Sequence, residues 1–153
     1  TINTSVGDDT ITGTGTVGIY NQAGGTINTG NGKDTLIGSG SIYGIFNDGT
    51  INTGCGNDTV DALTGGFGGI GTINLGNDND IVKGFGSGFF DGGSGYDKLE
   101  LSSGSYAVEI SGTTVSFTSN GISMNTSDFE KLIAGNTTYD FTSLFNGQTI
   151  TIA

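Results

Sequence analysis

The 153-residue chain has no histidine, no proline, no tryptophan and a single cysteine. Without histidine there is no Ser-His or Cys-His dyad and no imidazole metal ligand. The one cysteine, Cys55, excludes an internal disulfide and a Cys-x-x-Cys zinc site. The absence of proline argues against proline-rich disordered tracts and against collagen. Most of the usual catalytic constellations are therefore excluded at the outset.

Positive charge is also scarce. Four lysines and no arginine stand against fifteen carboxylates, for a formal net charge of −11. The chain lacks the basic surface that nucleic-acid binding needs. No apolar run approaches the roughly 18 residues of a transmembrane helix. An acidic excess of this size points to cations as partners. Carboxylates such as Asp48 and Asp61 could serve a glycan-acting enzyme, but no basic residues accompany them, so no catalytic activity is predicted.

Glycine, in contrast, is abundant, with 31 residues arranged in an internal repeat. The tripeptide Thr-Ile-Asn begins at Thr1, Thr26, Thr50 and Thr72. A nine-residue unit overlaps the end of each tripeptide, and a fifth unit follows. The five units are NTSVGDDTI from Asn3, NTGNGKDTL from Asn28, NTGCGNDTV from Asn52, NLGNDNDIV from Asn74 and DGGSGYDKL from Asp91.

Each unit carries an aspartate at its seventh position and an aliphatic residue two positions later. The aspartates are Asp9, Asp34, Asp58, Asp80 and Asp97, and the aliphatic residues are Ile11, Leu36, Val60, Val82 and Leu99. Glycines at alternating positions permit positive φ and turn carbonyl oxygens inward. Loops of a repeating coil stack about 4.8 Å apart, where bare carboxylates repel by about a kcal/mol or more per pair. The column therefore predicts cations between the loops, and its oxygen-only ligands favour Ca²⁺ over Mg²⁺.

The unit DGGSGYDKL matches the GGxGxDxU nonapeptide of the RTX (repeats-in-toxin, haemolysin-type) calcium-binding proteins, and the chain resembles that family. Thr29 and Thr53 depart from the pattern in the second and third units, and Ser5 and Asp78 replace glycine in the first and fourth. The resemblance implies parallel β-rolls with Ca²⁺ between successive loops, up to about four ions in the four gaps. The resemblance implies that the five aspartates above are side-chain ligands of the ions. It also implies that backbone carbonyls complete each ligand shell, at the positions Gly7, Gly30, Gly32, Gly54, Gly56, Gly76, Asp78, Gly93 and Gly95.

One nonapeptide per long coil departs from the family's usual two. The second half of the coil repeats as well, since Gly18-Ile19-Tyr20-Asn21 returns as Gly44-Ile45-Phe46-Asn47. The prediction is an all-β chain, with a right-handed parallel β-helix or β-roll solenoid over residues 1–99 and calcium along one edge. Tyr20, Tyr43, Phe46, Phe67, Phe89 and Phe90 are expected to stack in its core.

Residues 100–153 lose the repeat and predict a small antiparallel β-rich C-terminal cap. Alternation over 107–117, Asn120-Gly121 and then Ile122–Met124 predict a three-strand meander. Ser127-Asp128-Phe129-Glu130 fits a capping box and predicts a helical turn over 128–133. Two further strands are predicted at 138–141 and 149–153. An export signal for type I secretion is the other interpretation of this segment, and it is compatible with a cap.

The function predicted is a calcium-binding structural or adhesive module, secreted or on the cell surface, that folds when calcium binds. The N-terminal end has no cap, so self-assembly end to end, or contact with a cell-surface or matrix component, is the accompanying hypothesis. The alternatives are an ice- or glycan-binding solenoid and the non-catalytic module of a secreted glycan-acting enzyme or toxin. The Thr-Ile-Asn ladder favours the ice-binding alternative, but the next strand face, Thr12, Ile37, Asp61 and Lys83, is not uniform.

Overall fold

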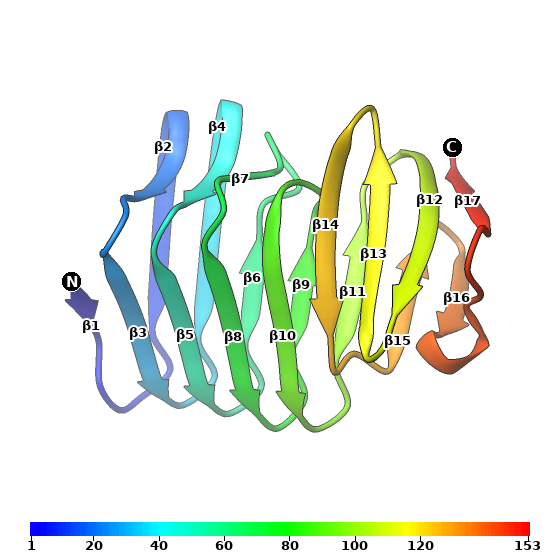
Figure 1. The fold of residues 1–153 in the computed structure, drawn as a ribbon. Helices are drawn as coiled ribbons and strands as arrows, with labels where there is room; N and C mark the ends of the chain where they lie inside the picture. Colours follow the sequence, from blue (N-terminus) through cyan, green and yellow to red (C-terminus); the bar gives the residue numbers. More distant parts are fainter.

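The structure, a computed structural model, describes residues 1–153. It contains strands, one short 3-10 turn, η1 (Phe141–Ser143), and no α-helix. The strands form two sheets, and the chain passes from one to the other as it advances from the N-terminus to the C-terminus (Figure 1). No helix long and apolar enough to cross a membrane is present.

The repeats supply parallel neighbours to both sheets. The first sheet takes β1 (Ile2–Asn3), β3 (Thr26–Asn31), β5 (Thr50–Cys55), β8 (Thr72–Asn77) and β10 (Gly88–Ser94). The second takes β2 (Thr10–Asn21), β4 (Thr35–Asn47), β6 (Thr59–Asp61), β9 (Ile81–Lys83) and β11 (Lys98–Leu101). The short strand β7 (Phe67–Gly68) pairs with β4.

Equivalent repeat positions pair with each other throughout. Ile27, Ile51 and Ile73 are register partners in the first sheet. Leu36, Val60 and Val82 are register partners in the second. All six side chains are buried in one hydrophobic core, because every second side chain of a strand points to the same face, and here that face is turned inward. The predicted all-β, largely parallel character is thereby confirmed.

The cap, residues 100–153, continues both sheets. The predicted meander is β12 (Gly104–Ser111), β13 (Thr114–Ser119) and β14 (Ile122–Ser127), paired antiparallel. Its last strand, β14, lies parallel to β10 and so extends the first sheet. The two further predicted strands are present as β16 (Thr137–Asp140) and β17 (Thr149–Ile152).

The helical turn predicted over 128–133 is wrong. Residues 128–130 form a loop, and the chain then enters β15 (Lys131–Ala134), which pairs parallel with β11 and antiparallel with β16. Glu130 does not cap a helix, because its carboxylate accepts the backbone N–H of Asp97 instead. A partner distant in sequence has overridden a local capping pattern.

The expected aromatic core is only partly correct. Phe67 and Phe90 are buried and meet edge to face, with ring centroids 4.9 Å apart. Tyr43, Phe46 and Phe89 are half-buried. Tyr20 is 63% exposed and stacks on Phe46 at 5.3 Å. Tyr20 and its register partner Phe46 alternate with buried neighbours on β2 and β4, so both rings lie on the outer face of the second sheet.

Candidate metal centre

The five repeat aspartates form a column along the loops that lead from the first sheet to the second, at the lower edge in Figure 1. The backbone N–H of each of the first four aspartates donates to Oδ1 of the aspartate in the next loop. The N···O distances are 2.9 Å from Asp9 to Asp34, 2.7 Å from Asp34 to Asp58, 2.7 Å from Asp58 to Asp80 and 2.8 Å from Asp80 to Asp97. We call these five residues the aspartate column.

The second carboxylate oxygen, Oδ2, is buried in all five members of the column and has no hydrogen-bond partner. Buried polar oxygens are nearly always paired, and an isolated buried negative charge is strongly unfavourable. Five such atoms in one register indicate that a positively charged group, or a proton, belongs beside them.

The electrostatics of the column agree with its burial. Removal from water, followed by the nearby charges of Asp58 and Asp97, raises the pKa of Asp80 to about 7. Burial, together with the charge of Glu130, raises the pKa of Asp97 to about 6. Burial also raises the pKa of Asp58. Asp58 and Asp97 thus make Asp80 harder to ionise, and no lysine compensates, since the two ion pairs of the chain involve Glu100 and Asp140.

Backbone carbonyls run beside the column because of the glycines. A Cβ placed on Gly54 would overlap the carbonyl oxygen of Gly30 in the preceding loop. A Cβ placed on Gly56 would likewise overlap the carbonyl oxygen of Gly32. The same close approach recurs in other loops: Gly30 meets Ser5, Gly32 meets Gly7, Gly76 meets Gly54, Gly93 meets Gly76, and Gly95 meets Asp78.

The two departures from glycine keep a positive φ. Ser5 has φ 90°, within the 87–109° of its glycine counterparts, whereas Asp78 has φ 83°, below the 121–150° of its own. L-residues other than glycine seldom take this conformation. The stacked loops therefore impose the conformation even where the residue disfavours it.

The residues present fit a cation bound by oxygen atoms. No three carboxylate or thiol side chains gather closely enough to hold a metal by themselves. One or two carboxylates with several backbone carbonyls remain as the available ligand set, which is a set that suits a hard ion such as Ca²⁺. Gly30, Gly54, Gly76 and Gly93 lie near the ends of β3, β5, β8 and β10, and the other predicted site residues lie in the loops at this edge.

Sequence analysis missed Glu130, which lies at the C-terminal end of the column. Its Oε2 accepts a hydrogen bond from the backbone N–H of Asp97 at 2.6 Å. Oδ1 of Asp97 accepts the same kind of bond from the backbone N–H of Asp80. A signal was available, since Glu130-Lys131-Leu132 repeats Asp97-Lys98-Leu99 with glutamate in place of aspartate. The register of β11 and β15 pairs Leu99 with Leu132.

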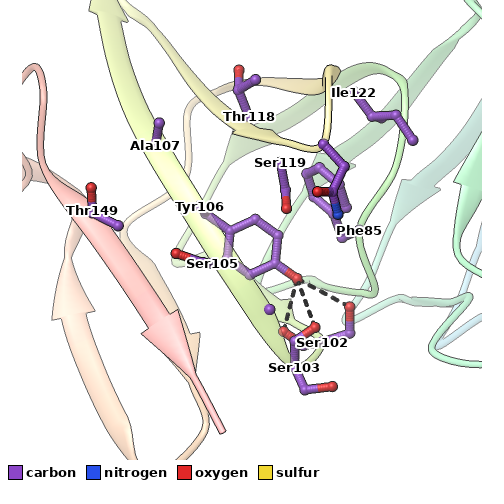
Figure 2. A pocket seen from close by; sticks show the side chains of 12 residues that line it. Phe85, Ser102, Ser103, Ser105, Tyr106, Ala107, Thr118, Ser119, Ile122 and Thr149 are labelled. Atoms are coloured by element: carbon purple, nitrogen blue, oxygen red, sulfur yellow. Dashed lines mark hydrogen bonds between the residues drawn. The ribbon is translucent and has the colours of Figure 1, made fainter.

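A separate hollow of about 500 Å³ lies in the cap (Figure 2). The ring of Tyr106 fills part of it and packs against Phe85 at a centroid distance of 4.8 Å. The hydroxyl of Tyr106 donates to the carbonyl of Ser102 at 2.9 Å. No carboxylate, lysine or cysteine lines this hollow, so it offers no acid–base pair or activated nucleophile.

No protein-family model matches the chain, and neither a curated protein nor a solved structure matches it.

Proposed function

We propose that the chain is a calcium-binding module whose repeats, residues 1–99, form a right-handed parallel β-solenoid of the RTX type, closed by the cap. The observation that carries this proposal is the set of five buried, unpartnered Oδ2 atoms in the aspartate column. A proton on each oxygen would be the other way to satisfy them, but even the raised pKa of Asp97, about 6, leaves its carboxyl mostly ionised at neutral pH. Calcium would supply the missing positive charge.

The chain's own residues have defined tasks in this proposal. Oδ2 of each aspartate is buried and free of hydrogen bonds, while Oδ1 of every column member after Asp9 accepts the backbone N–H of the aspartate in the preceding loop. The carbonyls beside Gly54 and Gly56 and their equivalents complete the oxygen shell. Up to about four ions between the five loops would change the formal charge from −11 to about −3, because each adds two positive charges.

Binding and folding are coupled in the proposal. Without cations, stacking the loops brings like charges together in a chain whose hydrophobic content is 33%. Such a chain is poorly able to compensate the entropy of folding. Extracellular calcium modules bind with dissociation constants of roughly 10⁻⁴ to 10⁻³ M. The role proposed is therefore a secreted or cell-surface structural or adhesive module that folds outside the cell.

Isothermal titration of calcium into the chain and into Asp58→Asn/Asp80→Asn tests this function. The double variant keeps an oxygen acceptor at each position but removes both charges from the middle of the column. It should bind calcium at least about tenfold more weakly than wild type. The matched control, Asp48→Asn/Glu109→Gln, removes two carboxylates that lie outside these loops and should bind as wild type does. Equal weakening in both double variants would point to general charge attraction and contradict a site in the column.

End-to-end assembly through unpaired strand edges is an additional role that we propose. β1 and β2 are terminal strands of their sheets, and Ile2 is 46% exposed where its counterparts Ile27 and Ile51 are buried. Unpaired strand edges are templates for further pairing. Size-exclusion chromatography with light scattering across a calcium titration should show oligomers that appear with calcium. A compact monomer at every calcium concentration would contradict assembly.

A further inference from the structure

The ladder of backbone-to-carboxylate bonds does not end with the last repeat. Asp97 donates its backbone N–H to Glu130 Oε2, as Asp80 donates its own to Asp97 Oδ1. The register of β11 with β15 pairs Lys98 with Lys131 and places Glu130 at the repeat position of Asp97. A fifth gap therefore lies between the last repeat loop and the cap loop, in addition to the four gaps between repeats.

Two oxygens converge in this fifth gap. Asp97 is fully buried, and its Oδ2 has no hydrogen-bond partner. A Cβ on Gly92 would lie 3.0 Å from that oxygen and would overlap the main-chain carbonyl oxygen of Asp128. A carboxylate oxygen from the repeat and a carbonyl oxygen from the cap thus meet beside a residue without a side chain. The backbone of Asp128 has φ 55°, which belongs to the left-handed region.

The cap loop is shorter than the repeat loops, and the glutamate compensates. Between the paired positions Asp91 and Ser127 on one side and Leu99 and Leu132 on the other, the cap has three residues fewer. Glutamate has one more methylene group than aspartate, so its carboxylate reaches the Asp97 N–H from the shorter loop. This substitution keeps a negative charge at the end of the column.

The charges around the fifth gap have no cationic partner in the protein. Glu130, Asp91 and Asp128 all repel the charge of Asp97. The nearby ammonium group of Lys131 is paired with Asp140, on the other side of β15. A hydrogen-bonded loop closure alone would not require Asp97 Oδ2 to remain buried and unpaired.

We infer that the fifth gap binds a calcium ion of its own, through Asp97 Oδ2, the carbonyl oxygen of Asp128 and the carboxylate of Glu130. The cap is then a calcium-binding element that is fastened to the last repeat by the ion. This inference rests on the proposed function, because it assumes that the aspartate column binds calcium.

Native mass spectrometry at saturating calcium tests the inference by counting ions on wild type and on Glu130→Gln. Glutamine retains an oxygen acceptor for the Asp97 N–H but carries no charge. Wild type should hold one more ion than the variant, and titration calorimetry should show the remaining sites within about twofold of their wild-type affinity. The control Glu109→Gln removes an exposed charge from β12 and should leave the count unchanged.

The outcomes separate the two proposals. Equal counts for wild type and Glu130→Gln would overturn the fifth site and leave the repeat sites intact. A wild-type chain that binds no calcium would contradict the proposed function itself. If circular dichroism shows that Glu130→Gln does not fold, the wild-type count decides, because the five gaps predict five ions and four or fewer would overturn the inference.

Discussion

Removal of calcium should make the stability of this fold fall as pH rises, which is the reverse of ordinary acid denaturation. Asp80 has a pKa of about 7 in the fold, raised from 3.8 chiefly by burial. Between these values the folded chain holds a proton that the unfolded chain releases. The stabilisation is therefore complete below about pH 4, declines through neutral pH and is lost above the folded pKa.

The size of the effect follows from the shifts. At about 1.4 kcal/mol per pKa unit, the shift of Asp80 corresponds to a loss on the order of 4 kcal/mol between pH 4 and pH 8. The shift of Asp97, from 3.8 to about 6, corresponds to about 3 kcal/mol more. These losses are comparable to the roughly 5–15 kcal/mol that stabilises a typical domain. The metal-free chain should thus be folded in mild acid and largely unfolded at pH 8.

Urea unfolding in EDTA, followed by circular dichroism from pH 4 to pH 8, measures this slope. Asp80→Asn removes one titrating group while keeping an oxygen acceptor for the Asp58 N–H, so its stability should depend less on pH. Millimolar calcium should abolish the decline, because the ion replaces the protons. A stability that stays constant or rises between pH 4 and pH 7 in EDTA would refute the reasoning.

Two further predictions concern the stacking of the loops. Gly7→Ala and Gly56→Ala change residues of nearly equal φ, 123° and 121°, but only a Cβ at Gly56 meets a preceding carbonyl. Chemical denaturation in the presence of calcium should show that Gly7→Ala lowers the free energy of unfolding by about 1 kcal/mol and that Gly56→Ala lowers it by about 2 kcal/mol more. Equal losses in the two variants would contradict the close stacking. Asn47→Ala removes the donor to the Thr72 carbonyl and one acceptor of the buried Asn21 amide, which keeps the Thr50 carbonyl, and should cost about 2 kcal/mol. Asn28→Ala breaks two similar bonds in the more accessible outer ladder and should cost less than about 1 kcal/mol, so a similar loss in both asparagine variants would contradict the difference in burial.

The parallel register was predictable because the repeat supplies it residue by residue. Thr-Ile-Asn can bury isoleucine in successive turns only if equivalent positions lie side by side, and Ile27, Ile51 and Ile73 do so. The aspartate and glycine positions follow from the same register. The meander was predictable from local signals, since Asn120-Gly121 forms its second turn, with positive φ at both residues.

One wrong prediction depends on a contact that is distant in sequence. The segment from Ser127 to Glu130 satisfies a helical capping pattern, and its true partner, Asp97, lies more than thirty residues earlier. That error arises where the repeat meets the cap and equivalent positions no longer follow one another at the repeat spacing. The misplacement of Tyr20 is of another kind, because the alternation of β2 buries Ile19 and Asn21 and turns Tyr20 outward.

Far-UV circular dichroism at pH 7.5 tests the central claim most directly, because it asks whether the aspartate column needs calcium for the chain to fold. The spectrum in EDTA should be that of a disordered chain. A β-sheet spectrum should appear as calcium rises through roughly 10⁻⁴ to 10⁻³ M, and the same concentration of magnesium should not produce it. A β-sheet spectrum in EDTA identical to that in calcium would contradict the account.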